Sequence, residues 1–340
     1  MSKATIIPKT EADVAKLASQ TVAVLGYGAQ GHAHALNLRD SGVNVIVAQR
    51  ADGAEGSANP RYEQARRDGF EPAPIADAVS RSDLLIVGLP DDAAPGIYER
   101  EIRPNLRAGQ ALGFLHGFVI HYGRIAPPGD VDVILVAPKG QGRGVRREYE
   151  AGRGVVSLIA VAQDASGAAR DRALGWAGGI GSGRAGVIET TFADETETDL
   201  FGEQAVLCGG LSAMILAAFD TLVDAGYPPE LAYFECCHEA KLVTDLIHDG
   251  GIAFMRERIS TTARYGDVTR GPRLVDDVIR DRMKDVLSEI RSGAFAREFL
   301  EDSANGGARS KALCDAERGH AIEEVGARLR EMMWGRSRPE

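Results

Sequence analysis

The sequence predicts an α/β protein in which a doubly wound parallel sheet over residues 1–190 precedes an all-helical domain over residues 191–336. Three observations predict this arrangement. Short β-branched runs alternate with helical stretches in the first half, a glycine-rich turn follows the first run, and the runs stop near Thr190. Strands alternating with helices at this spacing form right-handed βαβ units. The chain of 340 residues is long enough for two domains of roughly 150 residues each.

The individual elements follow from the apolar runs and the breakers between them. Buried strands are expected at residues 21–25, 43–47, 84–87, 111–115, 131–136 and 155–161. Helices of the second half are expected at residues 203–225, 228–249, 273–292 and 311–333, because glycine and proline pairs separate these stretches.

Composition excludes several classes of protein. With 39 basic and 49 acidic side chains the net charge is -10, which argues against nucleic acid as the main partner. We find no apolar run approaching the ~20 residues of a membrane helix and no signal-peptide core. We therefore expect a cytoplasmic protein without a membrane partner. The four cysteines form no C-x-x-C, so neither a zinc knuckle nor a disulfide framework is expected.

The turn after the first strand has the pattern G-x-G-x-x-G and opens a helix. It reads Gly26-Tyr27-Gly28-Ala29-Gln30-Gly31. In this context the pattern is typical of a Rossmann-like dinucleotide site, where the second glycine lets the backbone approach a pyrophosphate. The free N–H groups of the helix N-terminus then bind the phosphates. The alternative is a glycine-rich turn that binds nothing.

The end of the second strand bears on the choice of cofactor. NAD-specific sites usually carry an acidic residue there, whereas this chain has Gln49-Arg50. An arginine suits a 2′-phosphate, and Ser57 in the following loop can donate to one. Asp52 in the same loop would repel it. The sequence therefore favours NADPH and leaves NADH possible.

Two pairs of carboxylates stand four residues apart in the helical half. They are Asp199 with Glu203, and Glu235 with Glu239. Residues i and i+4 share a helix face, where like charges repel unless a cation lies between them. Oxygen ligands without a thiolate suit Mg²⁺. The spacing alone favours solvated surface pairs, but apolar neighbours favour burial of the four acids, which brings a metal site level with that interpretation and leaves both open here.

A rival metal site is a di-iron centre. Glu235-x-x-His238 and Glu317-x-x-His320 both match the Glu-x-x-His element of di-iron helical bundles. That reading leaves the nucleotide turn unexplained.

Longer stretches resemble the ketol-acid reductoisomerases. They are the helix opening at residues 26–42, His116-Gly117-Phe118, residues 137–140, residues 145–149, residues 195–210, residues 232–236 and Ile259-Ser260. The resemblance covers roughly residues 4–333, and the length resembles the short form, whose helical domain is knotted. It implies a Mg²⁺-dependent 1,2-alkyl shift of a 2-acetohydroxy acid, 2-acetolactate or 2-aceto-2-hydroxybutyrate. Reduction by NADPH then gives the 2,3-dihydroxy acid, in valine, isoleucine and leucine biosynthesis.

The resemblance also assigns residues to roles. His116 and Lys139, which follow expected strands, become catalytic residues at the carboxyl ends of the sheet. Ser260 contacts the substrate carboxylate. The remaining assignments are the cofactor contacts Tyr27, Gly28, Ala29, Gln30, Arg50, Ser57, Asp91 and Gly142, and the ligands of two Mg²⁺ ions, Asp199, Glu203, Glu235 and Glu239. In the short form Glu235, Glu239 and Ser260 come from the partner subunit, which implies a homodimer, or a larger assembly of dimers, with shared active sites.

The chain departs from the family pattern at four places. Residues 139–143 read Lys-Gly-Gln-Gly-Arg in place of Lys-Gly-Pro-Gly-His, Val119 replaces an asparagine, Ala94 replaces a glutamine, and the loop 49–60 is long. The last change leaves cofactor preference open. Two other functions remain as alternatives: a β-hydroxyacid or imine reductase, which needs no acidic cluster, and a non-catalytic NADP-binding protein.

Overall fold

The structure is a computed structural model that describes residues 4–53 and 57–335. It divides into two compact units between Thr198 and Asp199, rather than near Thr190. We call them the N-terminal unit and the helical unit. Helix α9 (Phe192–Gly202) crosses the division, since it starts beside the sheet and continues into the second half of the chain.

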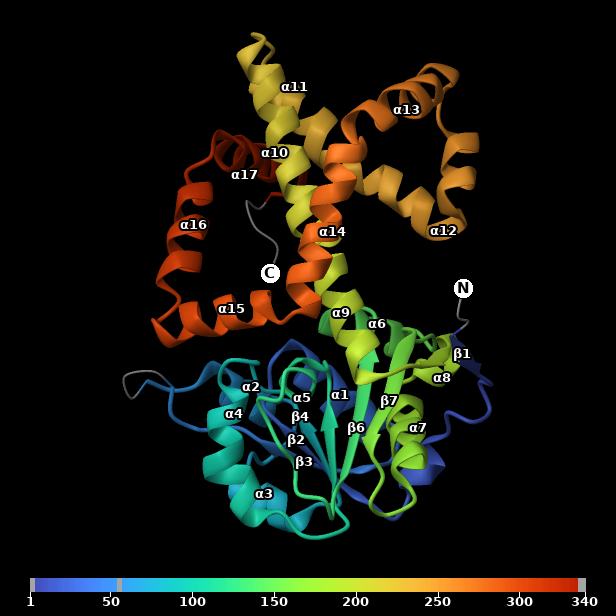
Figure 1. Cartoon of the computed structure of the whole chain (residues 1–340), viewed down its shortest axis with the longest axis vertical. Coiled ribbons are helices and arrows are strands. Elements are labelled where there is room, and N and C mark those ends of the chain that lie inside the picture. The colour runs from blue at the N-terminus through green and yellow to red at the C-terminus, as the bar shows by residue number, and fades with distance from the viewer. Residues whose placement is uncertain (1–3, 54–56, 336–340) are drawn as a thin grey trace. The chain divides into compact units, whose positions relative to one another are not determined.

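An eight-stranded sheet forms the centre of the N-terminal unit (Figure 1). Its strands lie in the order β1-β8-β7-β6-β5-β4-β2-β3. Their bounds are β1 (Thr5–Ile7), β2 (Thr21–Leu25), β3 (Asn44–Ala48), β4 (Leu84–Val87), β5 (Ala111–Phe114), β6 (Asp132–Pro138), β7 (Ser157–Gln163) and β8 (Val187–Glu189). The run β3-β2-β4-β5-β6 is parallel, so the prediction of an α/β fold with a Rossmann-like sheet is confirmed.

The far part of the sheet differs from the expected parallel arrangement. Strand β7 is antiparallel to β6, and β1, which we did not expect, is antiparallel to β8. The chain leaves β6, forms helix α6 (Gly142–Glu150) and returns to the same end of the sheet, where the Lys139 N–H donates to the Val156 carbonyl at 2.8 Å. Strand β7 therefore starts beside the end of β6 and runs back along it.

Helices cover the sheet of the N-terminal unit. Besides α6 they are η1 (Val14–Leu17), α1 (Ala29–Asp40), α2 (Pro60–Arg67), α3 (Ile75–Arg81), α4 (Ala94–Ile97), η3 (Tyr98–Ile102), η4 (Arg103–Asn105), α5 (Phe118–His121), α7 (Ala169–Gly179) and α8 (Ser182–Ala185). Helix α1 follows directly from the glycine-rich turn. It is buried on all sides over residues 33–38 and packs beside α6.

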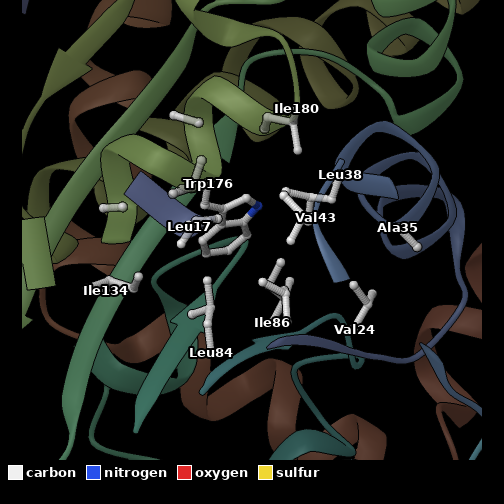
Figure 2. Packing of buried hydrophobic residues seen from close by; sticks show 14 of the residues in the cluster. Leu17, Val24, Ala35, Leu38, Val43, Leu84, Ile86, Ile134, Trp176 and Ile180 are labelled. Carbon is white, nitrogen blue, oxygen red and sulfur yellow. The ribbon is translucent and has the colours of Figure 1, made fainter. Parts of the chain in front are cut away.

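The core of this unit is built around Trp176 of α7, which is fully buried (Figure 2). Its indole lies among apolar side chains of α1 and of the strands, including Leu38 and Leu84. The indole N–H donates to His34 Nδ1 at 2.9 Å. A Cβ on Gly113 of β5 would lie 2.6 Å from the indole ring, so a residue without a side chain makes room for it. These contacts fix how α7 and α1 seat on the sheet.

The helical unit continues from α9 through eight further helices and two π-helical turns. They are η5 (Glu203–Leu207), α10 (Gly209–Asp224), α11 (Pro229–Tyr233), η6 (Phe234–His238), α12 (Ala240–Arg258), α13 (Thr261–Leu274), α14 (Asp277–Arg291), α15 (Ala294–Ala304), α16 (Ala308–Arg318) and α17 (Ala321–Trp334). The prediction of a helical second half is confirmed. The knot implied by the resemblance stays a prediction.

Several expected helix bounds in this unit are wrong. Helix α13 was not expected, because Gly271-Pro272 looked like a breaker, but Pro272 lies in its last turns. The expected helix 311–333 is two helices, since His320 accepts from the Ile322 N–H and starts α17 there.

The helical unit has a small buried core. Its members are Phe219, Ala232, Tyr233, Ile322, Val325 and Leu329. In the single chain many other apolar side chains are exposed, among them Leu211 at 43% and Leu242 at 55%. The continuous helical stretch Phe192–Asp224 is long and apolar enough to cross a membrane, and 6% of its apolar window is buried.

Our expectation that no apolar run approaches the length of a membrane helix is therefore wrong. The segment from Gln204 to Phe219 carries no charged side chain. Length and composition alone are weak evidence for a membrane, because the core helix of a soluble protein passes the same test. The observation establishes an apolar surface that the single chain does not cover.

Candidate active site

The glycine-rich turn has the geometry of a phosphate cradle. Gly26 has φ 97°, and a Cβ there would lie 2.6 Å from the Gly88 carbonyl oxygen. A Cβ on Gly31 would lie 2.1 Å from the Gly26 carbonyl oxygen, so the first and third glycines are needed for close packing. At Gly28 a Cβ would meet only the guanidinium of Arg61, at 3.9 Å, so the second glycine is less crowded than the other two. The turn fits a pyrophosphate bound at the N-terminus of α1.

Two cavities open at the carboxyl ends of the parallel strands. The first, which we call the fingerprint cavity, has a volume of about 320 Å³ and extends from residues 28–31 to His116. The second, the β3 cavity, has a volume of about 500 Å³ and is lined by Gln49 and Arg50 at the end of β3. Both border β2, where the order of the strands reverses, which is the usual ligand crevice of such sheets.

Five of the predicted cofactor residues line these cavities. Gly28, Ala29, Gln30 and Asp91 line the fingerprint cavity, and Arg50 lines the β3 cavity.

Three other predicted cofactor residues lie elsewhere. Tyr27 is buried in the core, where its hydroxyl donates to Asp68 Oδ2 at 2.9 Å. Burial, with the carboxylate of Asp68, raises the pKa of this phenol. Gly142 packs on the turn itself, since a Cβ there would lie 2.0 Å from the Ala29 carbonyl oxygen. Ser57 lies within the loop before α2 and accepts from the Gly53 N–H through its carbonyl. Neither Gly142 nor Ser57 is among the described residues lining the two cavities.

A buried carboxylate joins the two predicted catalytic residues. Glu195 of α9 accepts from Lys139 Nζ at 2.9 Å through Oε1. Its Oε2 lies 3.0 Å from His116 Nδ1 and accepts from the Gly117 N–H at 2.9 Å. His116 and Lys139 follow β5 and β6, so the structure brings the ends of two strands and one helix together, and His116 lines the fingerprint cavity.

The electrostatics of this cluster favour an ionised glutamate. The Glu195 side chain is 1% exposed, against 21% for His116 and 33% for Lys139. Burial would raise the pKa of Glu195, but the hydrogen bond and charge of His116, together with Lys139, outweigh burial and hold this pKa below its ordinary value. The carboxylate of Glu195 binds the Lys139 ammonium with one oxygen and faces the imidazole of His116 with the other.

The glycine of the His-Gly-Phe motif has a packing role. A Cβ on Gly117 would lie 2.3 Å from Thr196 Oγ1 and 2.9 Å from the Phe192 carbonyl oxygen. Helix α9 therefore approaches the end of β5 closely enough for Glu195 to reach His116 only because residue 117 has no side chain.

Two of the four predicted metal ligands, Glu203 and Glu235, lie in π-helical turns. Asp199 follows Glu195 by four residues on α9, and Glu203 begins the π-helical turn η5. Glu235 lies in the π-helical turn η6, and Glu239 caps α12. π-Helical turns are rare and occur often at functional sites. Both acidic pairs offer only oxygen atoms, a donor set that fits Mg²⁺.

Our expectation that these four acids are buried is wrong for the single chain. Glu203, Glu235 and Glu239 are exposed, and Asp199 is half-buried. Their apolar neighbours predicted burial, but many apolar side chains of this unit are themselves exposed. Ser260 is also exposed. It caps α13, with its Oγ accepting from the Ala263 N–H at 3.1 Å.

The di-iron alternative loses a ligand. His320 Nδ1 accepts from the Ile322 N–H, and its Nε2 lies 3.1 Å from Asp220 Oδ1. The His238 ring packs against Phe234 and Trp334. His320 therefore serves the N-terminus of α17.

Sequence reasoning missed Glu195. The signal was present, because Glu195 precedes Asp199 by the same four-residue spacing that drew attention to Asp199 and Glu203. It also missed Arg61 and Arg100, which line the cavities from α2 and η3.

Comparisons with known proteins agree with this geometry. Residues 16–186 match the model of the acetohydroxy acid isomeroreductase NADPH-binding domain, and residues 192–334 match the model of the ketol-acid reductoisomerase C-terminal domain. The chain is similar to the structure of an NADH-preferring ketol-acid reductoisomerase from an uncultured archean, with 45% identity and a TM-score of 0.94 over 96% of this chain and 99% of the other.

More distant structures share the fold alone. A semialdehyde dehydrogenase NAD-binding protein from Cupriavidus necator has 20% identity and a TM-score of 0.60 over 81% of this chain and 99% of the other. A putative oxidoreductase from Jannaschia sp. CCS1 has 14% identity and a TM-score of 0.59 over 80% and 97%.

Proposed function

Because the chain belongs to the ketol-acid reductoisomerase family, we propose that it converts a 2-acetohydroxy acid to a 2,3-dihydroxy acid by a Mg²⁺-dependent 1,2-alkyl shift and a reduction by NADPH. The substrates are 2-acetolactate and 2-aceto-2-hydroxybutyrate, in branched-chain amino-acid biosynthesis. The observation that carries this proposal is the His116–Glu195–Lys139 cluster at the fingerprint cavity, since a cofactor bound along the glycine-rich turn reaches that cavity.

The three residues of the cluster have different roles in the proposed reaction. Glu195 holds His116 by its Nδ1, which leaves Nε2 to exchange a proton with a substrate oxygen. Lys139, held in place by its hydrogen bond to Glu195, stabilises negative charge that develops on the substrate. Glu195 itself touches neither substrate nor cofactor in this scheme and is a positioning residue.

The acidic pairs would hold the metal. Asp199, Glu203, Glu235 and Glu239 supply carboxylate oxygens, and two bound Mg²⁺ ions act as Lewis acids toward the oxygens of the substrate. The chain's own part is to present each pair on one helix face.

The proposal includes a second copy of this chain. The helical unit leaves apolar side chains such as Leu211, Met214 and Leu242 exposed, and a stable soluble protein covers such a surface. We infer a homodimer, or a larger assembly of dimers, in which Glu235, Glu239 and Ser260 of one copy complete the site of the other. The cytoplasmic location and the absence of nucleic-acid and membrane partners stay predictions.

The β3 cavity supports NADPH. It is lined by three guanidinium groups, of Arg50, Arg61 and Arg100, and by two carboxylates, of Asp92 and Glu101. The excess of positive charge suits a 2′-phosphate. The similar archaeal protein prefers NADH, so both cofactors belong in the test.

The experiment is cofactor oxidation by the purified full chain with 2-acetolactate. It is run with NADPH and with NADH, each with Mg²⁺ and with a chelator. We expect oxidation that needs Mg²⁺ and is faster with NADPH. Oxidation unaffected by the chelator would remove the metal assignment. No oxidation by a protein that still binds cofactor would favour a β-hydroxyacid or imine reductase instead.

A further inference from the structure

Arg61 lies at the junction of the two cavities. Among the described lining residues it is the charged side chain that the fingerprint cavity and the β3 cavity have in common. The other shared residues are Gly88, Leu89 and Pro90, which carry no charge. A dinucleotide lying across this crevice therefore passes Arg61 on its way from one cavity to the other.

The guanidinium of Arg61 stands over the second glycine of the turn. A Cβ on Gly28 would lie 3.9 Å from Arg61 Nη1 and 4.0 Å from its Cζ. Gly28 is the residue whose backbone approaches the pyrophosphate in such turns. Backbone donors of α1 and the side chain of Arg61 thus face the same space.

Local hydrogen bonds fix this position. Asn59 caps α2, its side-chain oxygen accepting from the Arg61 N–H at 3.1 Å. The amide of the same side chain donates to the Arg50 carbonyl at 2.9 Å. The first turn of α2, which carries Arg61, is therefore tied to the end of β3.

The guanidinium is available to a ligand. In residues 4–53 and 57–335 no side chain forms a hydrogen bond or ion pair with it. Its planar fork can donate to two phosphate oxygens at once. The pyrophosphate joins the two halves of a dinucleotide, so a ligand with one half in each cavity has its pyrophosphate at the junction.

We propose that Arg61 binds the pyrophosphate of the nicotinamide cofactor, as a contact common to NADPH and NADH. The inference rests on the proposed function, since it requires the chain to bind such a cofactor. The inference gives different roles to Arg50 and Arg61, which the sequence alone does not distinguish. Arg50 lines the β3 cavity only, where a 2′-phosphate distinguishes NADPH, whereas Arg61 contributes to affinity without discriminating.

The test is calorimetric titration of the full chain with four probes: NADPH, NADH, ADP-ribose and 2′-AMP. ADP-ribose contains the pyrophosphate without a 2′-phosphate, and 2′-AMP contains a 2′-phosphate without a pyrophosphate. Arg61→Ala should weaken NADPH, NADH and ADP-ribose by a similar factor, on the order of 10- to 100-fold, and leave 2′-AMP unchanged. Arg50→Ala should weaken NADPH and 2′-AMP and leave ADP-ribose unchanged.

Arg66→Ala is the matched control, because Arg66 is an exposed arginine of the same helix and lines neither cavity. It should bind all four probes like the parent. Arg61→Lys keeps the charge without the fork, and should recover part of the ADP-ribose affinity if Arg61→Ala remains folded.

Three outcomes contradict the inference. If Arg61→Ala binds ADP-ribose like the parent, Arg61 does not bind the pyrophosphate. If it loses affinity only for NADPH and 2′-AMP, Arg61 binds the 2′-phosphate instead. In both cases the proposed function stands. A parent protein that binds none of the four probes contradicts this inference and the proposed function together.

Discussion

The two units of the molecule differ in how they cover their apolar side chains. In the N-terminal unit Trp176, Phe114 and the strand residues around them are almost completely buried by the unit's own helices. In the helical unit Leu211 and Leu242 are about half exposed, and the described core is small. The first unit therefore has a complete core in one chain. The second has apolar surfaces that its own chain leaves exposed. The candidate site residues are divided between the two units in a similar way.

The nucleotide cavities and the His116–Glu195–Lys139 cluster are assembled within the N-terminal unit. The acidic pairs, by contrast, begin at the half-buried Asp199, and Glu203, Glu235, Glu239 and Ser260 are exposed. A single chain therefore assembles the proposed cofactor site, whereas the residues of the proposed metal site form two pairs that are separate in sequence.

Removing the central indole gives the largest expected effect on stability. Trp176→Ala should reduce the free energy of unfolding by about 3–5 kcal/mol, because it leaves a cavity between the sheet and two helices and removes the partner of His34. Denaturant unfolding of the purified variant measures this. A matched Trp334→Ala change in the helical unit, at a side chain that is 56% exposed, should cost far less. Equal losses would contradict the contrast between the units.

Asp199→Asn should separate the two kinds of site. Loss of one anionic metal ligand should reduce turnover by about 100-fold or more. Mutation of residues that only hydrogen-bond to metal ligands already costs roughly 10- to 100-fold in metal affinity or activity. NADPH affinity should be unchanged, since the nucleotide cavities are lined by residues of the N-terminal unit. Turnover is measured by cofactor oxidation and affinity by calorimetry. Unaltered turnover would exclude Asp199 from the metal site.

Glu195→Gln tests the positioning role. The amide keeps the shape but loses the negative charge that faces His116 and binds Lys139, so turnover should fall by about tenfold or more. A purely structural role would leave the pH profile of the remaining activity unmoved. We expect the profile to shift, because the substitution removes a negative charge 3.0 Å from His116 Nδ1 and 2.9 Å from Lys139 Nζ. The Glu197→Gln variant, two residues along α9, is the control.

The buried histidine gives the smallest effect. Burial lowers the pKa of His34 from 6.5 to about 3, so between these values the unfolded chain binds a proton that the folded chain does not. Stability is then full above pH 6.5 and falls as the pH decreases. The loss should be about 1 kcal/mol at pH 5.5, as measured by denaturant unfolding. In His34→Gln the free energy of unfolding should depend less on pH between pH 7.5 and 5.5. An unchanged dependence would mean that other groups cause it.

The sequence predicted features that depend on local patterns and missed those that depend on contacts distant in the sequence. The turn at Gly26 and the strand ends at His116 and Lys139 are local patterns, and the structure places them at one edge of the sheet. The antiparallel direction of β7 depends on where α6 packs, which no local pattern encodes. The role of Glu195 was missed because its partners are distant in the sequence: Gly117 lies 78 residues away and Lys139 lies 56 residues away.

The helical unit was predicted less well for the same reason. Its helix ends depend on caps such as His320, and the exposure of Glu235 depends on what covers the unit rather than on its neighbours in sequence. The four-residue spacing of the acids was informative about helix faces but carried no information about which molecule faces them.

The most direct test of the account is subunit complementation. Asp199→Asn and Glu235→Gln, each inactive alone, are mixed, exchanged by mild denaturation and reassembled, with mass spectrometry to verify mixed dimers. If Glu235 acts across a dimer, each mixed dimer holds one intact site out of two. Random exchange should then recover about a quarter of the parent activity. No recovery in verified mixed dimers would place all four carboxylates of a site in one chain and contradict the division between the two units.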